Sequence, residues 1–93
     1  MVIGLVTASI SIPEARSLKD KRSVLRSLKD RILNKMNVSV AEVGRQDQWQ
    51  YAELAFVTVA AESEIVQGRM AEIGDFLRST PRFVLVHFNT ELL

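Results

Sequence analysis

The apolar residues of this 93-residue chain change their spacing four times: twice from every second residue to every third or fourth, and twice back again. From Val2 to Ile12 most even positions are apolar, whereas Thr7, Ser9 and Ser11 are polar. This alternation predicts a strand with one buried face. Pro13 ends the strand, because its ring removes the backbone N–H that a strand would use.

A helix is predicted to follow. Ser17 stands three residues before Asp20, a spacing similar to a capping box, so we expect the helix to begin there and to extend to about Met36. Asn37 is expected to end it in a left-handed conformation. A short strand, Val38 to Val43, comes next. The core stripe of the helix is predicted to consist of apolar residues at helical spacing, Leu18, Leu25, Leu28, Ile32 and Met36.

The second half of the chain also predicts a strand, a helix and a further strand in succession. Residues 44–48 have the composition of a turn and residues 49–61 that of a long strand, which together predict a β-hairpin. Ser63 is expected to cap a second helix, Pro81 to end it, and residues 83–92 to form the last strand. The buried face of this helix is predicted to carry Val66, Met70, Ile73 and Leu77.

The predicted order of elements is β-α-β-β-α-β, in a single domain over residues 1–93. This order predicts an α+β, ferredoxin-like fold, in which a four-stranded antiparallel sheet carries two helices on one face. Right-handed crossovers place both helices on the same side and leave the other face of the sheet open. We expect that open face to display Ile3, Leu5, Thr7 and Ser9 from the first strand and Leu85, His87 and Asn89 from the last.

The open face and the hairpin are the predicted partner-binding regions. A domain of this length buries only about 60 to 65% of its unfolded surface, which favours a homodimer. Leu5 on the open face, and Trp49 and Tyr51 beside the hairpin turn, are the residues we expect to contact a partner. The alternative is that the two aromatic residues close the end of the core or a dimer seam. Asp47 is expected to cap the hairpin by accepting hydrogen bonds from backbone amides.

Charge is distributed unevenly along the chain, which has 12 basic and 11 acidic residues in total. Residues 1–36 hold eight of the basic residues and three of the acidic ones. At helical spacing Lys19, Arg22, Arg26 and Lys29 lie along one flank of the first helix, over about 15 Å. Such a ridge fits a nucleic-acid backbone, or it is a solvated face that Asp20 and Asp30 partly neutralise. Lys21 projects toward the core side, and we expect it to extend past the helix end.

Several chemistries are disfavoured by the residues present. The chain has no cysteine and one histidine, His87, and its glycines form no phosphate-binding loop, so we expect neither an enzyme nor a cofactor or metal site. The apolar start is shorter than the roughly 20 residues that cross a bilayer, and we expect a cytoplasmic protein. RNP-type aromatic residues and a GXXG loop are lacking, so any RNA target is expected to be recognised by its shape.

Three blocks of sequence resemble one family. They are the segments Ala-Arg-Ser-Leu-Lys-Asp-Lys-Arg (15–22), Asn-Val-Ser-Val-Ala-Glu-Val (37–43) and Asp-Gln-Trp-Gln (47–50), and they are similar to the YlxP-like family, also called domain of unknown function 503. The resemblance implies a small bacterial ferredoxin-like protein of uncharacterised function. Genes of this family commonly lie near those of ribosome-binding factor A and an initiation factor, which implies a role in ribosome assembly or translation. The resemblance implies no catalytic residues. It points to four basic residues as RNA contacts: Arg16, Lys19, Lys21 and Arg22.

The sequence therefore supports two hypotheses about function. In the first, the protein is a non-enzymatic factor that binds structured RNA or a ribosomal subunit through its basic first helix. In the second, it is a homodimeric protein-interaction or small-ligand-sensing module that uses the open sheet face. The RNA contacts predicted by the first hypothesis are Arg16, Lys19, Lys21, Arg22, Arg26 and Lys29.

Overall fold

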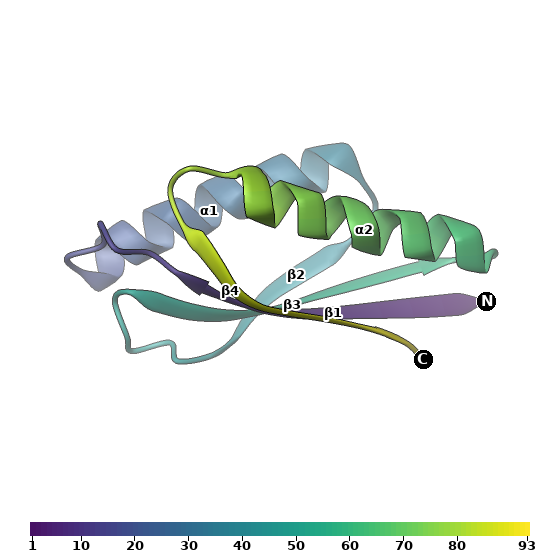
Figure 1. The fold of residues 1–93 in the computed structure, drawn as a ribbon, viewed down its shortest axis with the longest axis horizontal. Coiled ribbons are helices and arrows are strands. Elements are labelled where there is room, and N and C mark those ends of the chain that lie inside the picture. The colour runs from purple at the N-terminus through teal and green to yellow at the C-terminus, as the bar shows by residue number, and fades with distance from the viewer.

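The computed structural model describes residues 1–93 and contains the six predicted elements in the predicted order (Figure 1). The strands pair in the order β2-β3-β1-β4, and every neighbouring pair is antiparallel. The ferredoxin-like α+β fold is thereby confirmed. The elements are β1 (Val2–Ser11), α1 (Leu18–Lys35), β2 (Ser39–Gly44), β3 (Tyr51–Ala60), α2 (Ser63–Ser79) and β4 (Val84–Leu92).

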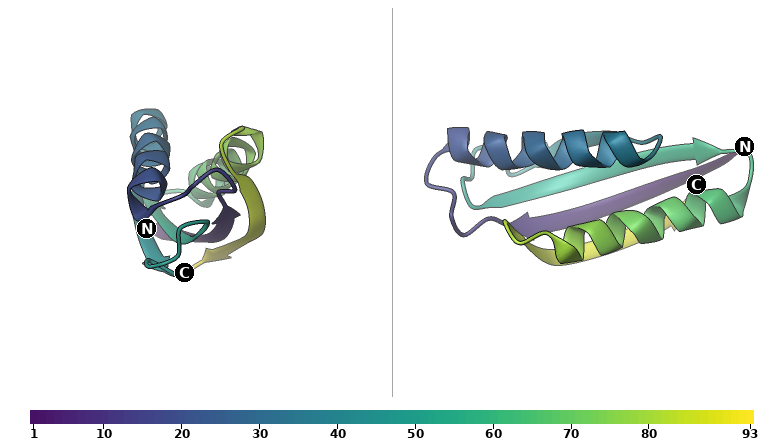
Figure 2. Two further views of the ribbon diagram at one scale, coloured as in Figure 1. Left: turned by 90° about the vertical axis from the view of Figure 1, so that its left-hand side faces the viewer. Right: turned by 90° about the horizontal axis from the view of Figure 1, so that it is seen from above.

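Both helices cover the same face of the sheet, and the core lies between the helices and the strands (Figure 2). The even-numbered residues of β1 and β3 point into this layer, as their alternation predicts, and Val6, Ile10 and Phe56 are fully buried there. The molecule is elongated, with extents of 42 × 21 × 17 Å. Neither helix has the length and apolarity that crossing a membrane requires.

The start of α1 forms as predicted, but its end does not. Ser17 Oγ accepts a hydrogen bond from the backbone N–H of Asp20 at 3.0 Å, and Asp20 Oδ2 accepts one from the N–H of Arg16 at 2.9 Å. These bonds satisfy N–H groups that have no partner within the helix. The expected left-handed Asn37 is wrong: Met36 is the C-cap in extended conformation, and Arg45 is the one non-glycine residue with positive φ.

Helix α2 is held by packing and not by a side-chain cap. Its N-cap is Glu62, which makes no side-chain cap bond, and Ser63 is already helical, so the predicted Ser63 cap is wrong. The predicted apolar stripe is buried, however. Gly4 of β1 lies directly under the helix, since a Cβ atom there would be 2.5 Å from Val66 Cγ1. The missing side chain of Gly4 therefore lets α2 approach the sheet closely.

The open face of the sheet differs from expectation on β4. Strand β1 presents its odd residues there, as predicted. On β4 the pairing shifts, because His87 lies opposite Ser9 while Leu85 lies opposite Ile10, which leaves Val86 as an extra residue. The extra residue reverses the alternation, so Leu85 packs against the core and its predicted place on the open face is wrong. His87 and Asn89 do lie on the open face.

Candidate functional site

Four cations of α1 lie along one side of the helix and are here called the basic flank: Lys19, Arg22, Arg26 and Lys29. The first three side chains are exposed and Lys29 is half-buried. Arg22, Arg26 and Lys29 line a groove of about 340 Å³ that runs between α1 and Glu42 of the edge strand β2. The structure therefore brings the predicted ridge together and gives it a neighbouring concave surface.

No residue of the basic flank has a charged partner within the protein. The two ion pairs of the chain lie elsewhere, and so do its cation–π contacts. Asp20 accepts a backbone hydrogen bond and Asp30 forms no ion pair, so neither neutralises the flank by direct pairing. On the opposite side of α1, Arg31 and Lys35 lie 4.9 and 5.5 Å from the ring centre of Phe76. The basic flank is thus the part of α1 whose cations have neither a charged nor an aromatic partner.

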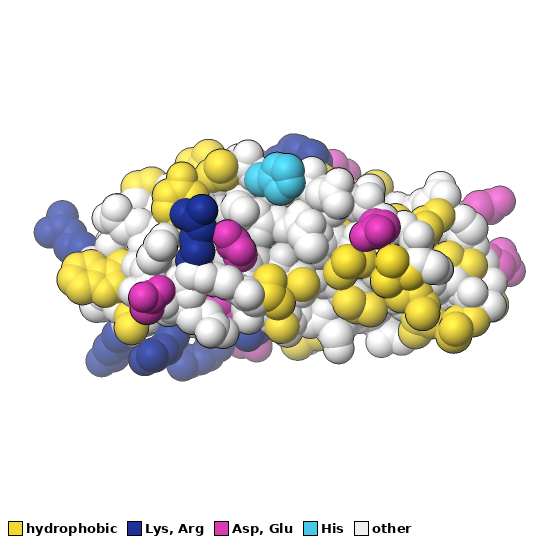
Figure 3. All heavy atoms as spheres, turned by 90° about the horizontal axis from the view of Figure 1, so that it is seen from below, with side chains coloured by type: hydrophobic (Ala, Val, Ile, Leu, Met, Phe, Trp, Pro, Cys, Tyr) yellow, Lys and Arg dark blue, Asp and Glu magenta, His cyan; other side chains and the backbone are white.

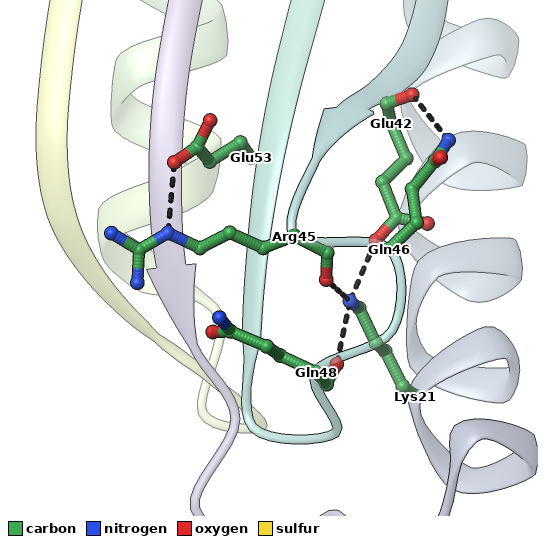
Figure 4. A network of polar contacts seen from close by, with 6 residues as sticks. All are labelled: Lys21, Glu42, Arg45, Gln46, Gln48 and Glu53. Carbon is green, nitrogen blue, oxygen red and sulfur yellow. Dashed lines mark hydrogen bonds and ion pairs between the residues drawn. The ribbon is translucent and has the colours of Figure 1, made fainter.

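Lys21 is buried and is not part of this surface. Its residue is 1% exposed, and its Nζ donates hydrogen bonds to the carbonyl oxygens of Arg45 and Gln48, both at 2.7 Å (Figure 4). The same Nζ lies 2.7 Å from Glu42 Oε2. Three oxygen atoms therefore replace water around the ammonium group. The predicted role of Lys21 as an RNA contact is wrong, and so is its expected extension past the helix end.

The loop between β2 and β3 closes over Lys21. Arg45 has a φ of 56°, the left-handed conformation, and its carbonyl oxygen also accepts a hydrogen bond from the N–H of Gln48 at 3.0 Å. The Arg45 side chain turns outward, where its Nε donates to Glu53 Oε1 at 2.9 Å and its guanidinium lies 5.2 Å from the ring centre of Tyr51. The loop backbone thus binds the buried lysine while the Arg45 side chain faces the open sheet.

A second set of hydrogen bonds fixes the far side of the same loop. The backbone oxygen of Gln50 accepts a bond from Ile12 N–H at 2.9 Å, and its side-chain Nε2 donates to the carbonyl oxygens of Pro13 and Ala15, both at 3.2 Å. The bonds of Lys21 and Gln50 together are here called the loop clamp. The loop clamp ties the hairpin end to the connection between β1 and α1.

Trp49 lies between the two halves of the loop clamp and is 52% exposed. It precedes the first residue of β3, whereas Tyr51 is the first strand residue and is half-buried opposite Ser11. Trp49 therefore does not close the end of the core. Asp47 accepts no hydrogen bond from the loop, so its expected capping role is wrong.

Leu5 belongs to a different region, an apolar patch on the open face. It is half-buried opposite Val57, and Val57 and Val59 are 41% and 46% exposed. We define the apolar patch as Ile3, Leu5, Val57 and Val59. Figure 3 shows one group of hydrophobic side chains on the half of this face away from the hairpin end, separate from those at the hairpin end. The structure thus does not bring Leu5 together with Trp49.

His87 and Arg16 are the remaining residues that the sequence analysis singles out. His87 is exposed on the open face opposite Ser9. No group of three or more His, Asp or Glu side chains lies close enough to hold a metal ion. Arg16 is exposed immediately before the N-cap of α1, and only its backbone is bonded to the helix.

Nearly the whole chain is similar in sequence to known proteins. Residues 3–90 match the family described as "Protein of unknown function (DUF503)". The chain belongs to the DUF503 family. It is also 32% identical over 90 residues to the Bacillus subtilis (strain 168) protein described as "Uncharacterized protein YlxP", a match that covers 97% of this chain and 98% of that relative. The predicted resemblance is confirmed.

The loop clamp connects the three sequence blocks that resemble the DUF503 family. Ser17 and Lys21 in the first block, Glu42 in the second, and Gln48 and Gln50 in the third all belong to the capped start of α1 or to the loop clamp. Sequence reasoning missed this link between the blocks. The available signal was a lysine in the first turn of a helix whose projected direction faced the core.

Proposed function

We propose that this DUF503 protein is a non-enzymatic factor that binds structured RNA, in the setting of a ribosomal subunit, through the basic flank of α1. One observation carries the proposal: four cations lie in line on one helix, and none of them has a charged partner in the protein. Unpaired cations at this spacing fit a row of backbone phosphates.

The groove beside the flank supports the same partner. It also contains the carboxylates of Asp30 and Glu42. The charge of Glu42 is compensated by Lys21, so Arg22, Arg26 and Lys29 share the groove with a single uncompensated carboxylate. Because three cations outweigh one anion, the groove attracts polyanions. From Lys19 to Lys29 the flank spans about 15 Å, enough for a few phosphates.

The proposal is tested by sedimentation of ribosomal subunits through a sucrose cushion at low and high salt. Wild-type protein is expected to pellet with subunits at low salt only, since phosphate contacts weaken as salt rises. The variant Lys19→Gln/Arg22→Gln/Arg26→Gln is expected to remain in the supernatant. Glutamine keeps most of each side-chain stem and removes the charge, so packing changes little.

The matched control is Arg31→Gln/Lys35→Gln/Arg82→Gln. It removes the same amount of charge from exposed positions, two of them on the opposite flank of α1. It is expected to pellet like wild type. If both triple variants are released equally, the binding depends on net charge and not on the basic flank, and the proposal fails. It also fails if wild-type protein does not pellet.

The number of phosphate contacts is measured by the salt dependence of binding to RNA. Four contacts on single-stranded RNA give a slope of log K against log salt of about −3, at roughly 0.7 per contact. The single change Arg22→Gln is expected to reduce the magnitude of that slope by about 0.7. A slope that is unchanged in this variant shows that Arg22 does not contact phosphate.

A second candidate, a homodimeric interaction module, is favoured by the apolar patch. Its four residues are uncharged, and the neighbouring positions on β2, Ser39 and Ala41, are uncharged as well. Glu91, opposite Leu5, lies at its border. Because two such patches place no like charges against each other at their centres, a second copy of the chain is the occupant that fits this surface.

The dimer is tested by static light scattering of wild-type protein and of the Leu5→Glu and Val57→Glu variants. Wild-type protein is expected to have the mass of two chains and both glutamate variants the mass of one. Ser9→Glu, on the same face but outside the patch, is the control and is expected to remain dimeric. A monomeric wild type, or glutamate variants of unchanged mass, would remove this candidate.

A further inference from the structure

We infer that Trp49 is a stacking platform for an unpaired base of the RNA, next to the basic flank that contacts its phosphates. This inference rests on the proposed function and specifies the kind of RNA: a helical segment that ends in, or is interrupted by, unpaired nucleotides.

The first observation is that Trp49 is exposed although its backbone is fixed on both sides. Gln48 before it is bound through its carbonyl oxygen to Lys21 Nζ, and Gln50 after it makes three hydrogen bonds to residues 12–15. The Trp49 residue itself is 52% exposed. A large aromatic group held on a rigid loop loses little conformational entropy when it binds a partner, which favours binding.

The second observation is the position of Trp49 relative to the cations. Lys21, which binds the loop, is followed directly by Arg22 of the basic flank, and Lys19 lies two residues before it. Arg16 is exposed one residue beyond Ala15, whose carbonyl oxygen binds Gln50. Figure 3 shows hydrophobic side chains with Lys and Arg side chains beside them at this end of the molecule. Aromatic and basic groups together form the usual surface for unpaired nucleotides.

The third observation is the acidic neighbour of Trp49. A shallow depression of about 460 Å³ at the loop is lined by residues 47–51, including Asp47 and Trp49. The Asp47 carboxylate repels phosphate, so the backbone of the RNA is expected on the α1 side of this depression. A neutral base is compatible with Asp47, because base N–H groups can donate hydrogen bonds to a carboxylate.

The experiment uses two RNA probes with the full-length protein: a hairpin with a single-stranded adenosine loop, and a blunt duplex with the same stem length. Trp49 is the sole tryptophan, so its fluorescence reports stacking directly. The hairpin is expected to quench this fluorescence and the duplex is not. Trp49→Ala is expected to weaken hairpin binding roughly 5- to 150-fold and to leave duplex binding and the salt slope unchanged.

Two further variants keep the result interpretable. Trp49→Phe retains a smaller ring and is expected to lose less hairpin affinity than Trp49→Ala. Ile65→Ala removes an exposed apolar side chain of α2, outside this depression, and is the control, with no expected change. Because Trp49 is exposed, circular dichroism is expected to show the wild-type fold for all three variants.

The possible failures are distinguishable. If neither RNA binds wild-type protein at low salt, both the proposed function and this inference are overturned. If the basic-flank variant loses both RNAs but Trp49→Ala binds them like wild type, or if the hairpin leaves the fluorescence unchanged, only the stacking role is overturned. The same holds if Trp49→Ala reduces sedimentation with ribosomal subunits and not hairpin binding, because the contact is then with a protein.

Discussion

The two helices lie on the same face of one sheet but are fixed to it by different interactions. The first turn of α1 is held by polar contacts, namely the Ser17 cap and the hydrogen bonds and ion pair of Lys21. In α2 no side chain caps the start, and close packing over Gly4 of β1 takes the place of such contacts. Both helices bury an apolar stripe along their length, so the difference lies in what their remaining side chains contact.

The cations of the two helices differ in the same way. On α2, Arg69 donates hydrogen bonds to Thr58 Oγ1 and the Val59 carbonyl oxygen, and Arg78 lies 4.9 Å from the ring centre of Phe88. Both are therefore part of the packing of α2 on the sheet. The basic flank of α1 makes no such contacts. This difference is why we place the binding surface on α1, and the following predictions test whether the two helices are held as described.

The largest expected effect is that of Lys21→Met. The change leaves Glu42 and two carbonyl oxygens without their buried partner, and removing one member of a buried ion pair costs about 3 to 5 kcal/mol. Because the Glu42 side chain is 18% exposed, we expect the lower end of that range, about 3 kcal/mol of unfolding free energy in urea denaturation.

Lys19→Met is the control for this measurement, because Lys19 is exposed two residues away on the same helix. Its effect is expected to stay within about 0.5 kcal/mol. The double variant Lys21→Met/Glu42→Leu is expected to recover part of the lost stability, since no unpaired charge then remains. Equal effects of the two lysine changes would show that the loop clamp does not hold α1.

The next largest effect is expected for Gly4→Ala, which tests the close packing of α2. The new methyl group would lie 2.5 Å from Val66 Cγ1 and 3.0 Å from Met70 Sδ, so the helix has to move outward. Overpacking of this kind costs about 1 to 3 kcal/mol, measured as a lower midpoint in urea. A neutral result would mean that α2 tolerates displacement and is not closely packed.

A smaller loss is expected for Ser17→Ala, which removes the hydroxyl that accepts the Asp20 N–H. Loss of an N-cap typically costs about 1 kcal/mol. Ser63→Ala at the start of α2 is the matched comparison, because Ser63 does not cap and is expected to change stability by less than about 0.5 kcal/mol. Thermal unfolding of the two variants should rank them in this order; the reverse order contradicts the cap assignment.

The smallest effect is a gain, expected for Gly68→Ala. No atom lies within 4 Å of the position where a Cβ would be, and Gly68 does not have a positive φ. Alanine in a helix interior is favoured over glycine by up to about 1 kcal/mol, so the thermal midpoint should rise. A fall in the midpoint would show that Gly68, like Gly4, serves close packing.

Much of the fold could be predicted because the periodicity of β1, α1 and α2 was clear. The errors are local. Residue type alone predicts caps at Asn37 and Ser63, but Met36 and Glu62 are the cap residues in the structure. Counting alternate residues places Leu85 on the open face, but the extra residue Val86 reverses the count. A bulge is a property of strand pairing, which one strand's sequence does not display.

The candidate site was predictable in one part and not in another. The alignment of Lys19, Arg22 and Arg26 follows from helical spacing alone. The burial of Lys21 required the carbonyl oxygens of Arg45 and Gln48, which lie more than 20 residues away in the chain. The exposure of Trp49 likewise depends on bonds that hold its neighbours and leave its own side chain outside.

By itself the sequence determined the order of the elements, the faces that β1, α1 and α2 bury and the row of cations on α1, because these depend on periodicities along a continuous segment. Tertiary structure decided which charges stay accessible and where the hairpin end is fixed. The physical reason is that a buried ammonium group needs oxygen partners from several segments. Only the folded chain brings Glu42 and the β2–β3 loop around Lys21, and that arrangement leaves the basic flank and Trp49 facing solvent.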